Sequence, residues 1–166
     1  MTSPDVTIRK ATVRDAEAIC AIYNPYIRNS IISFEETDVS VHEMTERIKA
    51  VTSNLPWLVV VRAGAVAGYA YASKWHARAA YRHAVETTIY IEETARGRRL
   101  GAELYSTLIA RLRSMGLRTA LGVIALPNAP SIALHEKCGF RKVAHLEAVG
   151  FKFGQWIDVG YWQIAL

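Results

Sequence analysis

The chain has 166 residues, of which 51% are hydrophobic and 21% charged, so it suits one packed domain over residues 1–166 and is unlike a disordered chain. No apolar run approaches the ~20 residues of a membrane span, and Met1 to Asp5 lacks the features of a signal peptide, so we expect a cytoplasmic protein without a membrane partner. The net charge is +5, but the basic residues concentrate between Lys74 and Arg118, which indicates a small-anion pocket at least as readily as a nucleic-acid surface.

The start of the chain predicts a strand followed by a helix. Val6–Lys10 has the composition of a short strand, and Thr12 with Asp15 resembles a capping box at a helix start. Apolar and aromatic side chains then recur at helical spacing over residues 19–26. Because proline lacks an N–H group and crowds the preceding turn, we expect Pro25 to break or kink this helix.

A second helix is predicted after a short extended stretch. Residues 31–34 are β-branched and aromatic, which indicates a strand or an extended loop. Ser40 and Glu43 then form another capping-box pair, and residues 44–51 carry one apolar face.

The rest of the chain predicts strands that alternate with two helices. The strands are expected over residues 57–62, 66–75, 86–91, 118–124, 141–148 and 156–165. The helices are expected over residues 100–115 and 131–138, each followed by a glycine. This order predicts an α/β (α+β) fold with a mixed, mostly antiparallel central sheet flanked by helices.

The junction between the strand ending at Ile91 and the helix starting at Leu100 is rich in glycine and arginine. Unpaired N–H groups and a partial positive charge at a helix start suit a phosphate, and arginine adds bidentate donors. A surface loop with solvated arginines is the alternative interpretation. The loop residues are Arg96, Gly97, Arg98, Arg99, Leu100 and Gly101.

This loop resembles the acetyl-CoA pyrophosphate loop of the GCN5-related N-acetyltransferase superfamily, whose pattern is Arg/Gln-x-x-Gly-x-Gly/Ala. Two further runs are similar to its phosphinothricin and methionine-sulfoximine N-acetyltransferases: Trp-x-x-Arg-x-x-Tyr at residues 75–81 and Asp-Val-Gly-Tyr-Trp-Gln at residues 158–163. The resemblance runs nearly end to end. One departure is Arg99, which stands where the loop pattern has glycine.

The resemblance implies a fold, a reaction and an assembly. The fold would be that of the superfamily, and the reaction would move acetyl from acetyl-CoA to the α-amino group of a small anionic amino-acid analogue such as phosphinothricin, methionine sulfoximine or methionine sulfone. Transfer would be direct between the two bound substrates, and the protein would be a homodimer. We expect no metal, because no His, Cys or Asp cluster in the sequence has ligand spacing.

Three residues are candidates for proton transfer. The resemblance implies that Glu86 removes the amine proton, through a water molecule, although an exposed strand carboxylate is the structural alternative. Tyr105 is placed early in the cofactor helix and is a candidate acid for the leaving thiolate, with helix packing as the alternative. His135 could face the acyl centre, although a lone histidine is more often structural.

The remaining candidates bind the two substrates. The resemblance implies that the strand before the loop splays from its neighbour and that its free backbone groups bind the cofactor arm. Asn128 is expected to contact the same arm, to cap the next helix, or both. The candidates for cofactor binding are Ile89, Tyr90, Ile91, Arg96, Gly97, Arg98, Arg99, Leu100, Gly101, Ala102 and Asn128. The candidates for substrate binding are Phe34, Lys74, Arg78, Tyr81 and Val159.

Three other functions fit parts of the sequence. A superfamily acetyltransferase acting on a protein N-terminus or lysine would need an open and often acidic groove, against which the basic segment 74–83 argues. A non-catalytic acetyl-CoA-binding module is favoured slightly by Arg99 and opposed by Glu86. A nucleic-acid binder rests only on the net charge.

Overall fold

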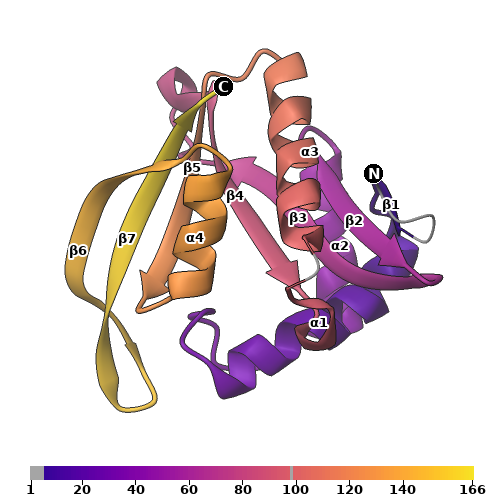
Figure 1. The fold of residues 1–166 in the computed structure, drawn as a ribbon, viewed down its shortest axis with the longest axis horizontal. Coiled ribbons are helices and arrows are strands. Elements are labelled where there is room, and N and C mark those ends of the chain that lie inside the picture. The colour runs from indigo at the N-terminus through magenta and orange to yellow at the C-terminus, as the bar shows by residue number, and fades with distance from the viewer. Residues whose placement is uncertain (1–5, 98) are drawn as a thin grey trace.

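The computed structural model describes residues 6–97 and 99–166 (Figure 1). The strands are β1 (Val6–Lys10), β2 (Trp57–Arg62), β3 (Ala65–Lys74), β4 (Ala84–Ile91), β5 (Thr119–Leu126), β6 (Arg141–Lys152) and β7 (Gln155–Ala165). The helices are α1 (Ala16–Asn29), α2 (Val41–Thr52), α3 (Leu100–Ser114) and α4 (Ala129–Lys137). Short 3₁₀ turns at Val13–Asp15, Ala79–Tyr81 and Glu93–Ala95 join some of them.

The strands form one sheet in the order β1-β2-β3-β4-β5-β7-β6. Every pairing in it is antiparallel except that of β4 with β5, which is parallel. The order follows from connection length: hairpins pair β2 with β3 and β6 with β7, whereas α3 supplies the crossover that a parallel neighbour requires. The expectation of a mixed, mostly antiparallel sheet flanked by helices is therefore confirmed.

The parallel pairing of β4 and β5 is short. Only residues 84–87 pair with residues 119–122, although each strand continues for four more residues. Beyond that point the two strands diverge, as Figure 1 shows. On its other side β4 stays paired with β3 as far as Ile91. The sheet thus has an opening at its centre.

Helices cover both faces of the sheet. On one face α1 and α2 pack against a cluster that includes Trp57, Val59 and Tyr69. On the other face the leucine side of α3 packs against Val60 and Ala70. Successive residues of β2, such as Val59 and Val60, belong to opposite clusters because strand side chains alternate between faces. The two cores hold the halves of the sheet in place around the central opening.

Two sequence predictions need correction. Helix α1 continues through Pro25 to Asn29, so the predicted break is wrong. Buried Ile22, Tyr23 and Ile27 surround that position, and their burial outweighs the loss of one backbone hydrogen bond. Of the two alternatives predicted for residues 31–34, the structure has the loop. The predicted end of β6 at residue 148 is also too early, since the strand runs to Lys152.

No helix among the residues described is both long and apolar enough to cross a bilayer.

The capping box predicted at Thr12 and Asp15 is present and joins an ion pair. The Thr12 backbone N–H donates to Asp15 Oδ2 at 2.7 Å, and the Arg9 guanidinium donates to both Asp15 oxygens at 2.8 and 2.7 Å. These bonds, with Arg9 as the largest cause, lower the pKa of Asp15. The carboxylate fixes the start of α1 against β1.

Replacing Asp15 by asparagine is expected to lower the free energy of unfolding by about 2 kcal/mol at pH 7, the usual cost of losing hydrogen bonds to a charged group. Because the folded-state pKa of Asp15 is lowered, the carboxylate stabilises the fold fully above its ordinary value of 3.8 and loses this effect as the pH falls further. Urea unfolding of both proteins from pH 7 to pH 3 should show the difference narrowing at the acid end. A constant difference would contradict this assignment.

Candidate functional site

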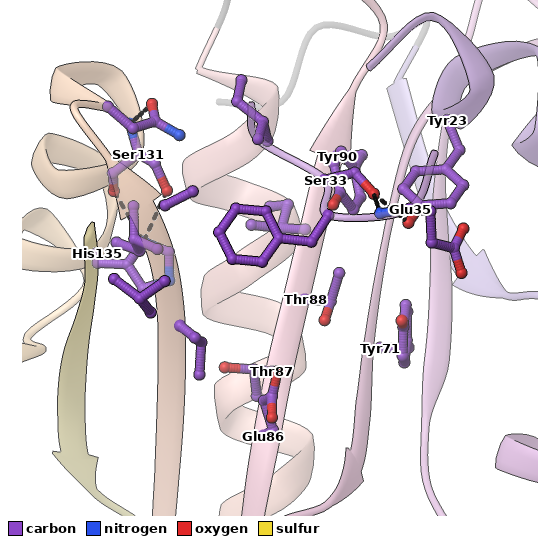
Figure 2. A pocket seen from close by; sticks show the side chains of 18 residues that line it. Tyr23, Ser33, Glu35, Tyr71, Glu86, Thr87, Thr88, Tyr90, Ser131 and His135 are labelled. Carbon is purple, nitrogen blue, oxygen red and sulfur yellow. Dashed lines mark hydrogen bonds between the residues drawn. The ribbon is translucent and has the colours of Figure 1, made fainter. Parts of the chain in front are cut away.

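A cavity of about 480 Å³ lies where β4 and β5 diverge. Its walls come from the loop after α1, from both diverging strands, from α4 and from β7 (Figure 2). The polar lining residues are Tyr23, Ser33, Glu35, Tyr71, Glu86, Thr87, Thr88, Tyr90, Asn128, Ser131 and His135. The apolar ones are Ile32, Phe34, Ile89, Val123, Ile124, Ala125 and Val159.

Glu86 reaches the cavity from the paired end of β4 (Figure 2). Partial burial raises the pKa of its carboxyl group, and the nearby charge of His76 opposes this shift weakly. A carboxylate with a raised pKa is a stronger base than one in water, so Glu86 can accept a proton from a group bound in the cavity.

Behind the cavity wall, His135, Tyr105 and Thr87 form a buried chain of hydrogen bonds. His135 Nδ1 donates to the Ser131 carbonyl oxygen at 2.8 Å, so in the neutral ring Nε2 is an acceptor. The Tyr105 hydroxyl then donates to Nε2 at 3.0 Å, and Thr87 donates to the Tyr105 oxygen at 2.7 Å. Burial lowers the pKa of His135, which favours this neutral ring.

Of the two ring side chains in this hydrogen-bond network, His135 and Tyr105, only His135 reaches the cavity. His135 lines it, whereas Tyr105 is fully buried and contacts the cavity through His135. Burial raises the pKa of Tyr105. The imidazole lies against the bare backbone of Gly122, since a Cβ there would stand 2.3 Å from Nε2. Tyr105 therefore lies behind the His135 ring and does not border the cavity itself.

A second cavity, of about 450 Å³, lies between the end of β4, the start of α3 and α4. Five residues line both cavities, so the two adjoin: Ile32, Ile89, Tyr90, Asn128 and Ser131. Other candidates for cofactor binding line the second cavity, namely Ile91, Arg96, Gly97, Arg99, Leu100, Gly101 and Ala102. Arg98 lies outside the described residues.

The loop before α3 has the backbone shape that its glycine pattern would require. Arg99 stands at the N-cap position with φ 62°, in the left-handed region that glycine adopts most easily. Its backbone carbonyl nevertheless accepts the N–H of Glu103 at 3.1 Å and starts the helix. The side chain is exposed beside the cavity. The presence of arginine instead of glycine at position 99 therefore adds a side chain but does not change the backbone turn before α3.

Neighbouring contacts fix the rest of this second cavity. The Arg96 guanidinium lies over the Tyr26 ring, 5.2 Å from its centroid, and the Tyr26 hydroxyl donates to the Ile91 carbonyl oxygen at 2.6 Å. Asn128 caps α4, because its Oδ1 accepts the Ser131 N–H at 3.2 Å. Helix α1 therefore supports the end of β4, and Asn128 sets the start of α4 beside it.

The predicted substrate-binding residues are not all brought together. Phe34 and Val159 line the first cavity, whereas Lys74, Arg78 and Tyr81 lie outside its lining in the single chain. Arg78 and Tyr81 are exposed on the segment that joins β3 to β4. Of the described residues that line the cavity, none is lysine or arginine.

Sequence reasoning placed Phe34 at the pocket but missed its neighbours, which form one wall of the cavity with it. Ser33 and Glu35 line the cavity beside Phe34, and Arg47 of α2 holds Glu35 Oε1 at 2.6 Å. The tyrosine hydroxyl of Tyr23 lies 2.7 Å from Ser33 Oγ. The one local signal for a loop at this position was the run of polar residues after Phe34, because a strand would have continued the apolar pattern.

Among residues 6–97 and 99–166, no group of three or more His, Cys, Asp or Glu side chains could hold a metal ion.

Comparisons with known proteins agree with this geometry. An acetyltransferase (GNAT) domain matches residues 8–160. The phosphinothricin N-acetyltransferase of Streptomyces viridochromogenes is 40% identical over 95% of this chain and 86% of its own length. The L-methionine sulfoximine/L-methionine sulfone acetyltransferase of Pseudomonas paraeruginosa is 36% identical over 96% of this chain and 94% of its own.

A solved structure shows the same fold with a ligand. The GNAT phosphinothricin acetyltransferase from Sinorhizobium meliloti, in complex with acetyl-CoA, matches with a TM-score of 0.94 and 39% identity over 98% of this chain and 89% of that one. The fold, the glycine-arginine loop at the start of α3 and the extent of these matches support one conclusion: the chain belongs to the GCN5-related (GNAT) family and is an acetyl-CoA-dependent N-acetyltransferase.

Proposed function

We propose that the chain transfers acetyl from acetyl-CoA to the α-amino group of a small anionic amino-acid analogue, such as phosphinothricin, methionine sulfoximine or methionine sulfone. The observation that carries this proposal is that the cavity containing Glu86 and the cavity at the start of α3 adjoin and share five lining residues. A cofactor arm in the second cavity, at the start of α3, would bring its acyl end into the first cavity beside Glu86. Relatives named for such acceptors support the substrate class.

The chemistry would proceed by direct transfer. Glu86 would accept the ammonium proton through a water molecule, which leaves the neutral amine as nucleophile. The diverging half of β4, residues 88–91, is no longer paired with β5, and the backbone groups on that edge of the strand would bind the cofactor arm and polarise the thioester carbonyl. Ile89 and Tyr90 are the central residues of this stretch, and Ile91 follows them with its carbonyl oxygen already held by Tyr26. His135 would hydrogen-bond the departing thiolate from the cavity wall through its Nδ1–H, and Tyr105 would hold the ring in this tautomer by donating to Nε2. The proton that Glu86 accepted from the ammonium group would return to the thiolate through water.

The cofactor phosphates would lie at the start of α3. Its first N–H groups and partial positive charge favour an anion, and Arg96 and Arg99 border the same cavity. Asn128, at the start of α4, would contact the arm of the cofactor from the opposite side.

The acceptor's anionic end would be met by Lys74, Arg78 and Tyr81. We propose that these residues act at the mouth of the cavity in a homodimer. The β6–β7 hairpin exposes large apolar side chains that a second copy would cover. They are Val149, Phe151, Phe153 and Trp156, with exposed fractions of 55%, 56%, 58% and 69%.

Replacing Glu86 by glutamine tests the base. The amide keeps the size and cannot accept the proton, so kcat should fall by about a hundredfold or more at neutral pH, with little change in acetyl-CoA affinity. Because burial raises the pKa of Glu86, the acidic limb of the kcat/KM profile of the unmodified enzyme should lie above the ordinary value of 4.5. A stopped assay of thiol release over pH 4 to 9 measures both the kcat of the variant and the pH profile of the unmodified enzyme. Near-normal kcat in the variant would remove Glu86 from the mechanism.

A pair of variants at position 99 separates side chain from backbone. Arg99→Ala and Arg99→Gly both remove the guanidinium and should weaken acetyl-CoA binding about fivefold, as expected for one exposed charged contact. Because alanine is strained at positive φ and glycine is not, the free energy of unfolding should be about 1 kcal/mol higher for Arg99→Gly than for Arg99→Ala. Calorimetry and urea unfolding give the two quantities. Tighter acetyl-CoA binding by Arg99→Gly would show that the arginine hinders the cofactor.

An acceptor panel tests the substrate class. The unmodified enzyme should release thiol fastest with phosphinothricin, methionine sulfoximine or methionine sulfone, and slowly with peptides and with a neutral amine of similar size. Arg78→Lys keeps the charge but loses the bidentate fork, so kcat/KM for the anionic acceptors should fall about thirtyfold. The neutral amine serves as the control, and its rate should change little. A preference for peptides, or an equal loss on both acceptor types, would overturn the proposed recognition.

A further inference from the structure

The tip of the β6–β7 hairpin lies against the end of α1, and a buried lysine stands at this contact. Lys152 is the last residue of β6 and is 3% exposed. Its ammonium group donates to three backbone carbonyl oxygens, those of Ile27 at 2.8 Å, Ser30 at 2.9 Å and Ser33 at 2.6 Å. These partners lie 119 to 125 residues away in the sequence.

All the hydrogen-bond donors of the Lys152 ammonium group are used at this contact. A lysine ammonium group has three N–H donors, and each one here has a carbonyl acceptor. Carbonyls in the last turn of a helix have no partner within the helix and carry partial negative charge, so a cation is favoured there. Lys152 therefore caps α1 from another element and extends the cap into the following loop.

The loop held in this way is the wall of the acceptor cavity. Ser33 and its neighbours Ile32, Phe34 and Glu35 all line that cavity (Figure 2). Removal of the ammonium group would leave three carbonyls short of a buried partner, two of them within residues 30–33. A buried carbonyl oxygen without a donor is costly, so the backbone of the loop would have to move until water or another donor could reach these oxygens.

The same strand makes a second contact with this wall. Gly150 lies two residues before Lys152, so both are on one face of β6. The Phe34 ring rests on its bare backbone, because a Cβ at Gly150 would stand 2.3 Å from Phe34 Cζ. The hairpin thus supports the loop at two successive positions on one face.

We propose that Lys152 is a positioning residue for acceptor binding: its ammonium group fixes residues 30–35, and with them Phe34, in the shape that receives the amino-acid substrate. This inference rests on the proposed function, since it assigns the first cavity to the acceptor. Lys152 lines neither cavity and would touch neither substrate. The loop that it holds contributes four residues to the acceptor cavity and only Ile32 to the cofactor cavity, so its effect would be larger on acceptor recognition than on cofactor affinity.

Lys152→Met tests the proposal, because the thioether side chain fills a similar space and donates no hydrogen bond. The KM for the acceptor should rise about tenfold or more, because a loop that has lost its buried hydrogen bonds must be ordered again before it can receive the acceptor. Acetyl-CoA affinity by calorimetry should change less than threefold, since only Ile32 of this loop lines the cofactor cavity. Lys142→Met makes the same change at an exposed position of the same strand and is the matched control. Equal losses for acceptor and cofactor would show only general destabilisation and would overturn the proposal.

Hydrogen exchange adds a measurement that needs no substrate. Amides of residues 30–35 should exchange at least tenfold faster in Lys152→Met than in the unmodified protein, while those of α3 stay unchanged. If the unmodified enzyme acetylates no acceptor of the panel, the proposed function fails, and this exchange result still decides whether the lysine holds the loop. Unchanged exchange, or faster exchange with an unchanged acceptor KM in an active enzyme, overturns the proposal. If Lys152→Met does not accumulate folded, Lys152→Gln, which keeps two donors, is measured in the same way.

Discussion

The early end of the parallel pairing between β4 and β5 is the constraint on which the site depends. Four residues of each strand are paired, and the next four diverge. A polar backbone edge without a partner is costly inside a protein, so such an opening persists only where the surroundings hold the strands apart or a ligand satisfies the edge. Here β3 holds β4 on one side and β7 holds β5 on the other.

The elements around this opening act as spacers. Helix α4 lies at the diverging end of β5, and its His135 ring rests on Gly122 at the last paired position. Helix α1 supports the end of β4 through the hydrogen bond from Tyr26 to the Ile91 carbonyl. Each spacer thus contributes a wall of the combined cavity, and the same contacts that keep the strands apart also place the polar groups within it.

Local features of the fold could be predicted from the sequence, and long-range ones could not. The capping pairs at Thr12 and Ser40, the β4 strand and the α3 loop were predicted because each depends on residues close together in the chain. The continuation of α1 through Pro25 was missed because it depends on packing against distant residues.

The candidate site shows the same division. Glu86 and the α3 loop follow from local patterns and from the family resemblance. Of the loop after α1 only Phe34 was predicted to line the pocket. The rest of this wall could not be predicted, because its shape depends on Arg47 and on a lysine more than a hundred residues away. The placement of Tyr105 behind His135 was also beyond prediction, since a helical position gives a face and not a neighbour.

The raised pKa of Glu86 has a consequence for how this protein can change over evolution. A carboxyl group whose pKa is raised by burial favours the folded state while it is protonated, below its ordinary value of 4.5, and that contribution is lost as the pH rises through the raised value. At neutral pH the ionised side chain is therefore a local weakness of the fold. Selection for thermal robustness alone would favour a neutral residue at this position, and the role in turnover that we propose for Glu86 would act in the opposite direction.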